Sequence, residues 1–191
     1  MVEALRTDRL LLRRWTAADR EPFAQMNADP RVMAHFSAAL TREESDALAD
    51  RIDAHFARRG FGAWAVEIPE VAPFAGFIGL AVPDFDAPFM PSVEIGWRLA
   101  AEYWGNGYAT EGARAALAFG FDTLGLAEIV SFTTPDNLQS RRVMERIGMM
   151  RDPADDFDHP NLPAGHPLRR HVLYRITKEG GKAETRKGGR A

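Results

Sequence analysis

The stretch EIGWRLAAEYWGNGYATEG, residues 94–112, is the most informative segment of this 191-residue chain. Its first apolar residues predict a strand, Gly105 and Gly107 predict a loop, and the residues that follow predict a helix. The first N–H groups of a helix lack backbone partners, and the helix dipole adds positive charge there. Glycine also lets the backbone approach a phosphate closely. The junction therefore predicts a pyrophosphate site, although an isolated Gly-x-Gly is more often a plain turn.

A dinucleotide-binding loop is the competing interpretation of this junction. That loop needs a third glycine near position 110 and an acidic ribose partner about 20 residues further on. Position 110 is threonine, and the flanking elements lie late in the chain. We therefore set this interpretation aside.

The rest of the chain alternates between helical and extended patterns. Helices are expected after Thr16, after Thr41, where Glu44 completes a capping box, after Gly107 and after Asn137. Short apolar runs bounded by turn residues predict the strands. These strands cover residues 9–15, 62–68, 74–82, 93–99, 128–134 and 170–177. The order predicts an α/β (α+β) fold with a mixed sheet and helices on both faces.

Composition narrows the class of protein. The net charge of −3 provides no global basic field for nucleic acid, and the absence of cysteine excludes disulfides and thiolate chemistry. No run approaches the roughly 18 apolar residues of a membrane span. We expect a cytoplasmic protein with one domain over residues 1–178, a disordered basic tail over 179–191, and no nucleic-acid or membrane partner.

Four segments together resemble one enzyme family. YWGNGYATEG is similar to the acetyl-CoA pyrophosphate loop of the GNAT superfamily of N-acetyltransferases. Three further segments resemble the Rim-type branch of this superfamily, the ribosomal-protein N-terminal acetyltransferases and their relatives. They are TDRLLLRRWTAAD, VEIGWRL and NLQSRRVMERIGM. The resemblance spans about residues 7–177 and implies the GNAT fold, whose mixed, mostly antiparallel sheet has about six or seven strands.

The resemblance implies acetyl-CoA as co-substrate and assigns residues to it. The backbone of the strand at 97–99 is expected to pair with the pantetheine arm, the loop is expected to hold the pyrophosphate, and Asn137 either contacts the arm or only caps its helix. The loop pattern has Gln or Arg where this chain has Glu102, so one phosphate contact is missing. The expected cofactor residues are Trp97, Arg98, Leu99, Trp104, Gly105, Asn106, Gly107, Tyr108, Ala109, Thr110 and Asn137.

The catalytic residues expected from the resemblance are Glu94 and Ser140. Glu94 lies in an apolar strand, where a carboxylate is costly unless it is paired with an arginine or serves as a base. The tyrosine that many members use as general acid corresponds to Met144, so Ser140, one turn earlier, or water takes that role. Glu111, in the first turn of the loop helix, is expected to serve only the helix dipole.

The two N-terminal helices and the loop at 152–168 are expected to choose the acceptor. The 152–168 loop is polar, and its candidate acceptor-binding residues are Asp155, Asp156, Asp158 and His159. Its acids favour a cationic amine, by an attraction that salt weakens. A metal site there lacks ordered ligand spacing, so none is expected. The chain is thus predicted to acetylate a primary amine, on a protein N-terminus or a small molecule, as a monomer or homodimer. The alternative is a non-catalytic acyl-CoA sensor, in which Glu94 is buried in a salt bridge.

Overall fold

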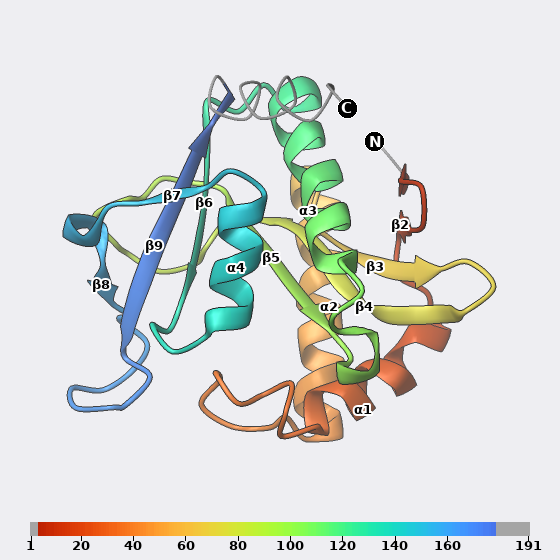
Figure 1. The fold of residues 1–191 in the computed structure, drawn as a ribbon. Helices are drawn as coiled ribbons and strands as arrows, with labels where there is room; N and C mark the ends of the chain where they lie inside the picture. Colours follow the sequence, from red (N-terminus) through yellow and green to blue (C-terminus); the bar gives the residue numbers. More distant parts are fainter. Residues whose placement is uncertain (1–3, 179–191) are drawn as a thin grey trace. The chain divides into compact units, whose positions relative to one another are not determined.

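The structure, a computed structural model, describes residues 4–178, in which nine strands and four α-helices form (Figure 1). The tail expected to be disordered, residues 179–191, lies outside the described residues. The chain divides into two units. Of the described residues, the first unit contains 4–81 and Gly96–Ala116, and the second contains Val82–Ile95 and 117–178. The boundary therefore falls inside one strand.

The first unit is built on consecutive strands. These are β1 (Ala4–Arg6), β2 (Leu11–Arg13), β3 (Ala63–Ile68), β4 (Ala72–Ala81) and the last four residues of β5 (Glu94–Leu99), in this spatial order. The pairs from β1 to β4 are antiparallel, and the hairpin of β3 and β4 turns at Glu70, whose φ is 64°. Ala100 continues the contact of β5 with β4, since its N–H donates to the Ala75 carbonyl at 3.0 Å.

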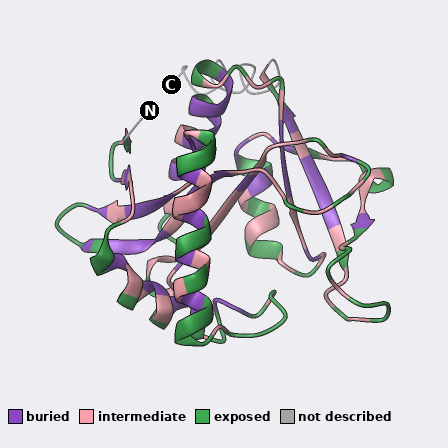
Figure 2. Ribbon diagram, turned by 180° about the vertical axis from the view of Figure 1, so that it is seen from behind, coloured by how far each residue is buried: buried purple, intermediate pink, exposed green. Residues whose placement is uncertain are grey.

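Helices cover both faces of β4. Phe23 of α1 (Arg20–Ala28) packs edge-on against Phe77 with ring centres 6.1 Å apart. Gly112 of α3 (Tyr108–Ala118) lies so close to Ile78 that a Cβ there would meet its side chain at 2.5 Å. Adjacent residues of a strand point to opposite faces, so α1 and α3 lie on opposite sides, as the sequence predicts. Figure 2 shows the result, helices exposed on one side and strands largely buried.

Helix α2 (Arg42–Arg59) begins and ends where its sequence indicates. The Thr41 hydroxyl accepts from the Glu44 N–H at 3.2 Å, and the Glu44 carboxylate accepts from the Thr41 N–H at 2.8 Å. This is the predicted capping box. Gly60 ends the helix in the left-handed conformation, with φ at 77°.

The second unit is organised around strand β9 (Arg170–Thr177). Strand β6 (Glu128–Thr133) pairs with it in antiparallel fashion, Ile129 opposite Ile176, and two short strands, β7 (Met150–Arg151) and β8 (Phe157–Asp158), also pair with it. The first residue of β5 lies opposite Val130 in a parallel pair. Helix α4 (Leu138–Arg146) follows β6. The buried centre contains Phe89, Val130, Phe157 and Leu173.

The predicted fold class is confirmed, with mixed and mostly antiparallel pairing. The strands number nine rather than six or seven because β1, β7 and β8 are only two or three residues long. Strands of that length show no readable alternation. Helix α3 continues beyond Ala118 as a π-helical turn, Phe119–Thr123. Across the described residues, no helix has both the length and the apolar character to cross a membrane.

Candidate active site

The glycine loop of the first unit is held in place by its own polar groups. The Trp104 indole N–H donates to the Leu99 carbonyl at 2.8 Å, which ties the loop to the end of β5. The Asn106 amide donates to the Tyr103 and Trp104 carbonyls at 3.3 and 3.1 Å. These bonds fix the loop before helix α3 begins at Tyr108.

Both glycines of the loop adopt the left-handed conformation and face open space. Their φ values are 79° for Gly105 and 81° for Gly107. A Cβ on Gly105 would meet no atom within 4 Å, and one on Gly107 would meet only the Arg9 guanidinium at 3.5 Å. Residues other than glycine rarely adopt this φ. Because glycine has no side chain, access to the backbone of the loop is open at both positions. With Ala109 and Thr110 in the first turn of α3, the loop fits a phosphate cradle.

Arg9 contacts the glycine loop, a role that the sequence analysis did not predict. It lies in the turn between β1 and β2, and its Nη1 donates to the Asn106 carbonyl at 3.0 Å. Its Nε and Nη2 bind the Glu111 carboxylate at 2.7 and 2.6 Å, and its guanidinium lies 4.8 Å from the Tyr108 ring centre. A cation is thus present beside the loop, although Glu102 occupies the usual cationic position. Because 102 residues separate Arg9 from Glu111, no local pattern signals the pair.

Glu111 does more than complement the helix dipole. Its carboxylate also accepts from the Thr7 hydroxyl at 2.6 Å and from the Arg9 N–H at 2.9 Å. Burial alone raises its pKa, but these hydrogen bonds hold the pKa below its ordinary value. Glu111 is therefore ionised at neutral pH and anchors the β1–β2 turn to α3.

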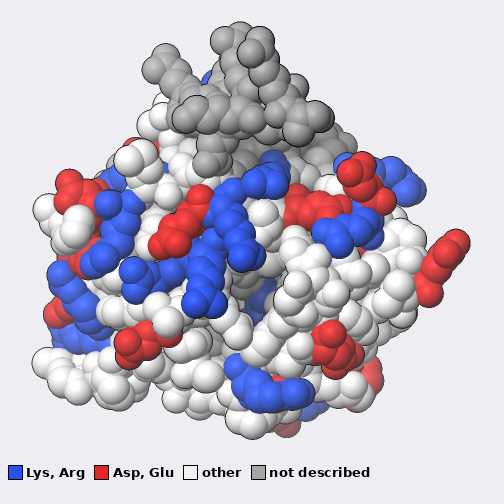
Figure 3. Space-filling model, in the orientation of Figure 1, with Lys and Arg blue, Asp and Glu red and all other residues white. Residues whose placement is uncertain are grey.

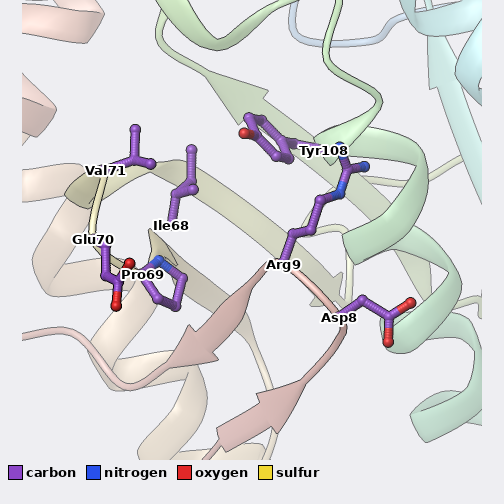
Figure 4. A pocket seen from close by; sticks show the side chains of 7 residues that line it. All are labelled: Asp8, Arg9, Ile68, Pro69, Glu70, Val71 and Tyr108. Carbon is purple, nitrogen blue, oxygen red and sulfur yellow. The ribbon is translucent and has the colours of Figure 1, made fainter.

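A pocket of about 290 Å³ borders the same loop (Figure 4). Arg9 extends from the β1–β2 turn toward Tyr108 at the start of α3, and the β3–β4 turn forms the facing wall. The pocket combines a guanidinium and an aromatic ring with exposed apolar surface from Val71, which is 67% exposed.

Glu94 begins strand β5 and belongs to the second unit. Among residues 4–178, no lysine, arginine or histidine forms an ion pair with it, so the salt-bridged arrangement expected of a non-catalytic module is not observed. Burial is the cause that raises its pKa, to about 8. A carboxyl with this pKa exchanges a proton near neutral pH, as a general base must.

Asn137 and Ser140 lie at the start of α4 in the second unit. The Asn137 side chain accepts from the Ser140 N–H at 3.2 Å and donates to the Thr133 hydroxyl at 2.9 Å. Asn137 is thus the helix N-cap, and its contact with pantetheine stays a prediction. The Ser140 hydroxyl forms no hydrogen bond with any residue of the described chain and remains available as a donor. Met144 is 1% exposed and packs in the core.

Three of the four acids of the 152–168 loop, the three expected to bind the acceptor, are paired with arginines. Asp155 binds Arg175 at 2.7 Å, and Asp158 lies 3.3 Å from Arg169. Asp156 binds Arg151, which is the main reason that its pKa lies below the ordinary value. Internal cations therefore compensate the charge that was expected to attract a cationic acceptor, and acceptor binding by these acids stays a prediction.

His159 lies in an aromatic cluster of the second unit. Its ring centre is 4.5 Å from that of Phe85 and 5.0 Å from that of His171. Its Nδ1 accepts from the Asn161 N–H at 3.3 Å, and burial lowers its pKa. A neutral imidazole against aromatic rings is suited to contact an apolar part of an acceptor. That role also stays a prediction.

Comparisons with known proteins identify the family of the chain. The family described as acetyltransferase (GNAT) domain matches residues 9–150. An uncharacterized N-acetyltransferase, YnaD of Bacillus subtilis, is 29% identical over 91% of this chain and 96% of its own. FsC-acetyl coenzyme A-N(2)-transacetylase of Aspergillus fumigatus is 36% identical over 63% of this chain and 52% of its own.

Solved structures have the same fold. An acetyltransferase from Agrobacterium tumefaciens superposes with a TM-score of 0.74 at 30% identity, over 93% of this chain and 96% of its own. RimJ of Mycobacterium smegmatis, in complex with CoA-disulfide, superposes with a TM-score of 0.71 at 19% identity, over 95% of this chain and 90% of its own. At that identity, the second likeness shows the fold alone.

Proposed function

Because the chain belongs to the GNAT acetyltransferase family and is an acyltransferase, we propose that it transfers the acetyl group of acetyl-CoA to a primary amine. The observation that carries this proposal is the open loop of two left-handed glycines in front of α3. Pyrophosphate is the natural ligand of such a loop, since it can accept several backbone N–H groups at once. Arg9 adds a charged donor at the same place.

Glu94 is the base in this proposal. An amine must be neutral to attack a thioester, and most amines are protonated at neutral pH. With its pKa raised to about 8, Glu94 accepts that proton directly or through one water. For a peptide α-amino group, whose pKa is about 8, this proton transfer is nearly balanced.

The remaining residues position the reaction and complete it. Bound acetyl-CoA supplies the reactive thioester, and the backbone of Trp97–Leu99 holds its pantetheine arm and donates an N–H toward the developing oxyanion. Ser140 provides a proton for the leaving thiolate. A thiol has a pKa of about 8.5, so this group needs little help to leave. Holding amine and thioester together therefore supplies much of the rate.

The assignment to the Rim-type branch is part of the proposal. Its support is the order of the loop segment and of the NLQSRRVMERIGM segment, which forms α4. The acceptor class, a protein N-terminus or a small molecule, is not specified by these motifs.

Replacing Gly107 by valine tests the phosphate loop. Valine is strained at a φ of 81°, and its side chain fills the space in front of the loop. We expect acetyl-CoA binding to fall at least 100-fold in calorimetry. Gly125→Val is the matched control, because Gly125 also has a positive φ, 69°, and open space, but lies outside the loop.

Both variants store similar backbone strain, so both lose similar thermal stability. The Gly125 variant keeps its acetyl-CoA affinity. A folded Gly107→Val protein that binds acetyl-CoA as tightly as the parent would show that the loop is not the phosphate site.

A further inference from the structure

Arg98 is a largely enclosed cation without a carboxylate partner. It lies in the part of β5 that belongs to the first unit, and its guanidinium stacks 4.1 Å from the Phe36 ring centre and 5.4 Å from that of Phe77. Its Nη1 donates to the Asn27 side-chain oxygen at 2.6 Å. Asn27 is neutral and is itself held by Ser45, to which it donates at 2.9 Å. None of these neighbours compensates the positive charge.

A neighbouring arginine of the same unit shows the contrast. Arg13 donates from both terminal nitrogens to Asp19, at 2.8 Å each, and from Nε to Glu67 at 2.8 Å. Its charge is fully matched, and these hydrogen bonds to Asp19 and Glu67 outweigh burial and raise its pKa. Burial also disfavours the charged form of Arg98, but no acid offsets the loss of water there. The pKa of Arg98 is therefore lowered, to about 10.

The free edge of the Arg98 guanidinium has the shape of a carboxylate site. Its Nε is buried and has no hydrogen-bond partner, and its Nη2 forms no hydrogen bond with the residues described. These two nitrogens lie on one side of the planar group and point their N–H bonds in parallel. Carboxylates bind that edge through two charge-assisted hydrogen bonds. A buried polar group left unsatisfied requires an explanation, and a missing anion provides one.

The position of Arg98 favours the acceptor as the source of that anion. Its side-chain contacts are with Asn27 of α1, with Phe36, in the segment between α1 and α2, and with Phe77 of β4, and none is with the glycine loop. Within the first unit, Arg98 is therefore placed to bind an anion other than the pyrophosphate that the glycine loop is proposed to hold.

We propose that Arg98 binds a carboxylate of the acceptor, so that the substrate is a small amine that also carries a carboxylate, an amino acid or a close analogue. This inference rests on the proposed acetyl transfer for the amine, but the anion site itself does not depend on it. It differs from the expectation of a purely cationic acceptor, whose basis, the acids of the 152–168 loop, is compensated by arginines.

Binding is measured first, without chemistry. The full chain is loaded with desulfo-CoA, which has no thioester, and titrated by calorimetry with alanine, leucine, phenylalanine and glutamate and with the amide of each α-carboxylate. We expect at least one carboxylate to bind tenfold or more tightly than its amide. Arg98→Met abolishes that preference, and Arg98→Lys keeps only part of it, because lysine retains the charge but not the planar fork.

Arg14→Met is the matched control. Arg14 also stacks on a ring, with its guanidinium 4.2 Å from the centre of Phe56, and its Nε is likewise buried without a partner, but it projects from the end of β2. Its replacement leaves the preference for carboxylates unchanged. Circular dichroism of each variant verifies folding, and Arg98→Lys decides the test if Arg98→Met does not fold.

Kinetics separate this inference from the proposed function. With acetyl-CoA, the same pairs are compared by release of free thiol, and Arg98→Met raises the KM for carboxylate acceptors more than it lowers kcat.

Three outcomes would contradict one proposal or the other. If acids and amides are acetylated with equal kcat/KM, and Arg98→Met does not change it, the carboxylate site is overturned but acetyl transfer stays intact. Selective binding without thiol release in the parent supports the site and contradicts the proposed function. Loss of desulfo-CoA affinity in Arg98→Met, with acids and amides bound alike, assigns the anion to CoA and overturns the inference.

Discussion

Glu94 combines a raised pKa with the position expected of a base. If it accepts the amine proton, kcat/KM rises with pH through a limb centred near pH 8. Glu94→Gln preserves shape but removes the acceptor, so this limb disappears and the rate at pH 8 falls about 10²- to 10⁴-fold. The measurement is a pH–rate profile with two acceptors whose amine pKa values differ by more than one unit. A limb that follows the acceptor pKa and survives in Glu94→Gln contradicts the role of Glu94.

The same carboxyl makes stability depend on pH in a defined direction. Its folded pKa, about 8, is above the ordinary value of 4.5, so the folded state holds the proton more tightly than the unfolded state. The resulting stabilisation is complete below pH 4.5 and is lost as pH rises toward 8. We expect the parent to lose a few kcal/mol relative to Glu94→Gln across this window. Urea unfolding of both proteins at pH 5 and pH 8.5 measures the difference, and parallel curves contradict it.

Single residues also show the limit of sequence reasoning. Gly105 and Gly107 could be predicted because their spacing before a helix has a local physical cause, and their positive φ values agree with it. Arg98 was expected to matter only through its backbone. The unpaired edge of its side chain depends on Asn27 and Phe36, which are distant in sequence. Long-range pairing of polar groups cannot be predicted from spacing.

At the scale of elements, the turn between β1 and β2 is attached to the start of α3. Arg9 bridges Glu111 and the Asn106 carbonyl and lies next to the open side of Gly107. Replacing Arg9 by methionine removes a charged donor from the phosphate loop. We expect acetyl-CoA affinity to fall about tenfold and its salt dependence to weaken, while S-acetylpantetheine, which lacks the pyrophosphate, binds as before.

Arg6→Met is the control for this change. Arg6 lies in strand β1 of the same hairpin and is exposed, so its replacement removes an equal charge without touching the loop. Its acetyl-CoA affinity stays within twofold of the parent. Equal losses in the two variants would show that Arg9 acts only through the general field of the protein.

Elements with a strong local pattern could be predicted, and those that depend on tertiary contacts could not. Strand β9 has the predicted bounds, and α2 has the predicted capping box and terminal glycine. The two-residue strands β7 and β8 form because the backbone N–H and C=O groups of β9 are available to pair with them. Their short sequences show no alternation of apolar and polar residues, so no strand was predicted at either place.

At the scale of the whole molecule, the proposed binding and catalytic residues are distributed over both units. The first contains the glycine loop and Arg98, and the second contains Glu94 and Ser140, with β5 running through the boundary. Basic and acidic groups are interspersed over the face drawn in Figure 3, in keeping with a net charge of only −3. Local ion pairs, rather than a single-sign field, therefore dominate its electrostatics.

The ion pairs of the second unit give the last prediction. Asp156 is almost enclosed, its side chain 8% exposed, and it is paired with Arg151. Asp158 is 53% exposed and only 3.3–3.4 Å from its arginines. Removing one partner of an enclosed pair leaves the other charge uncompensated, whereas an exposed pair contributes little. We expect Asp156→Asn to lower the free energy of unfolding by about 1–3 kcal/mol and Asp158→Asn by less than about 0.5 kcal/mol.

The pH dependence of that difference identifies its cause. Arg151 holds the pKa of Asp156 below its ordinary value of 3.8, so the stabilisation is present above that pH and is lost as the pH falls below it. The gap between the parent and Asp156→Asn is therefore constant from pH 5 to 7 and closes below pH 4. Acetyl-CoA affinity is unchanged in both variants, because the glycine loop belongs to the other unit. A gap that does not narrow at all as the pH falls below 3.8 would show that Asp156 stabilises the second unit by packing rather than by its charge.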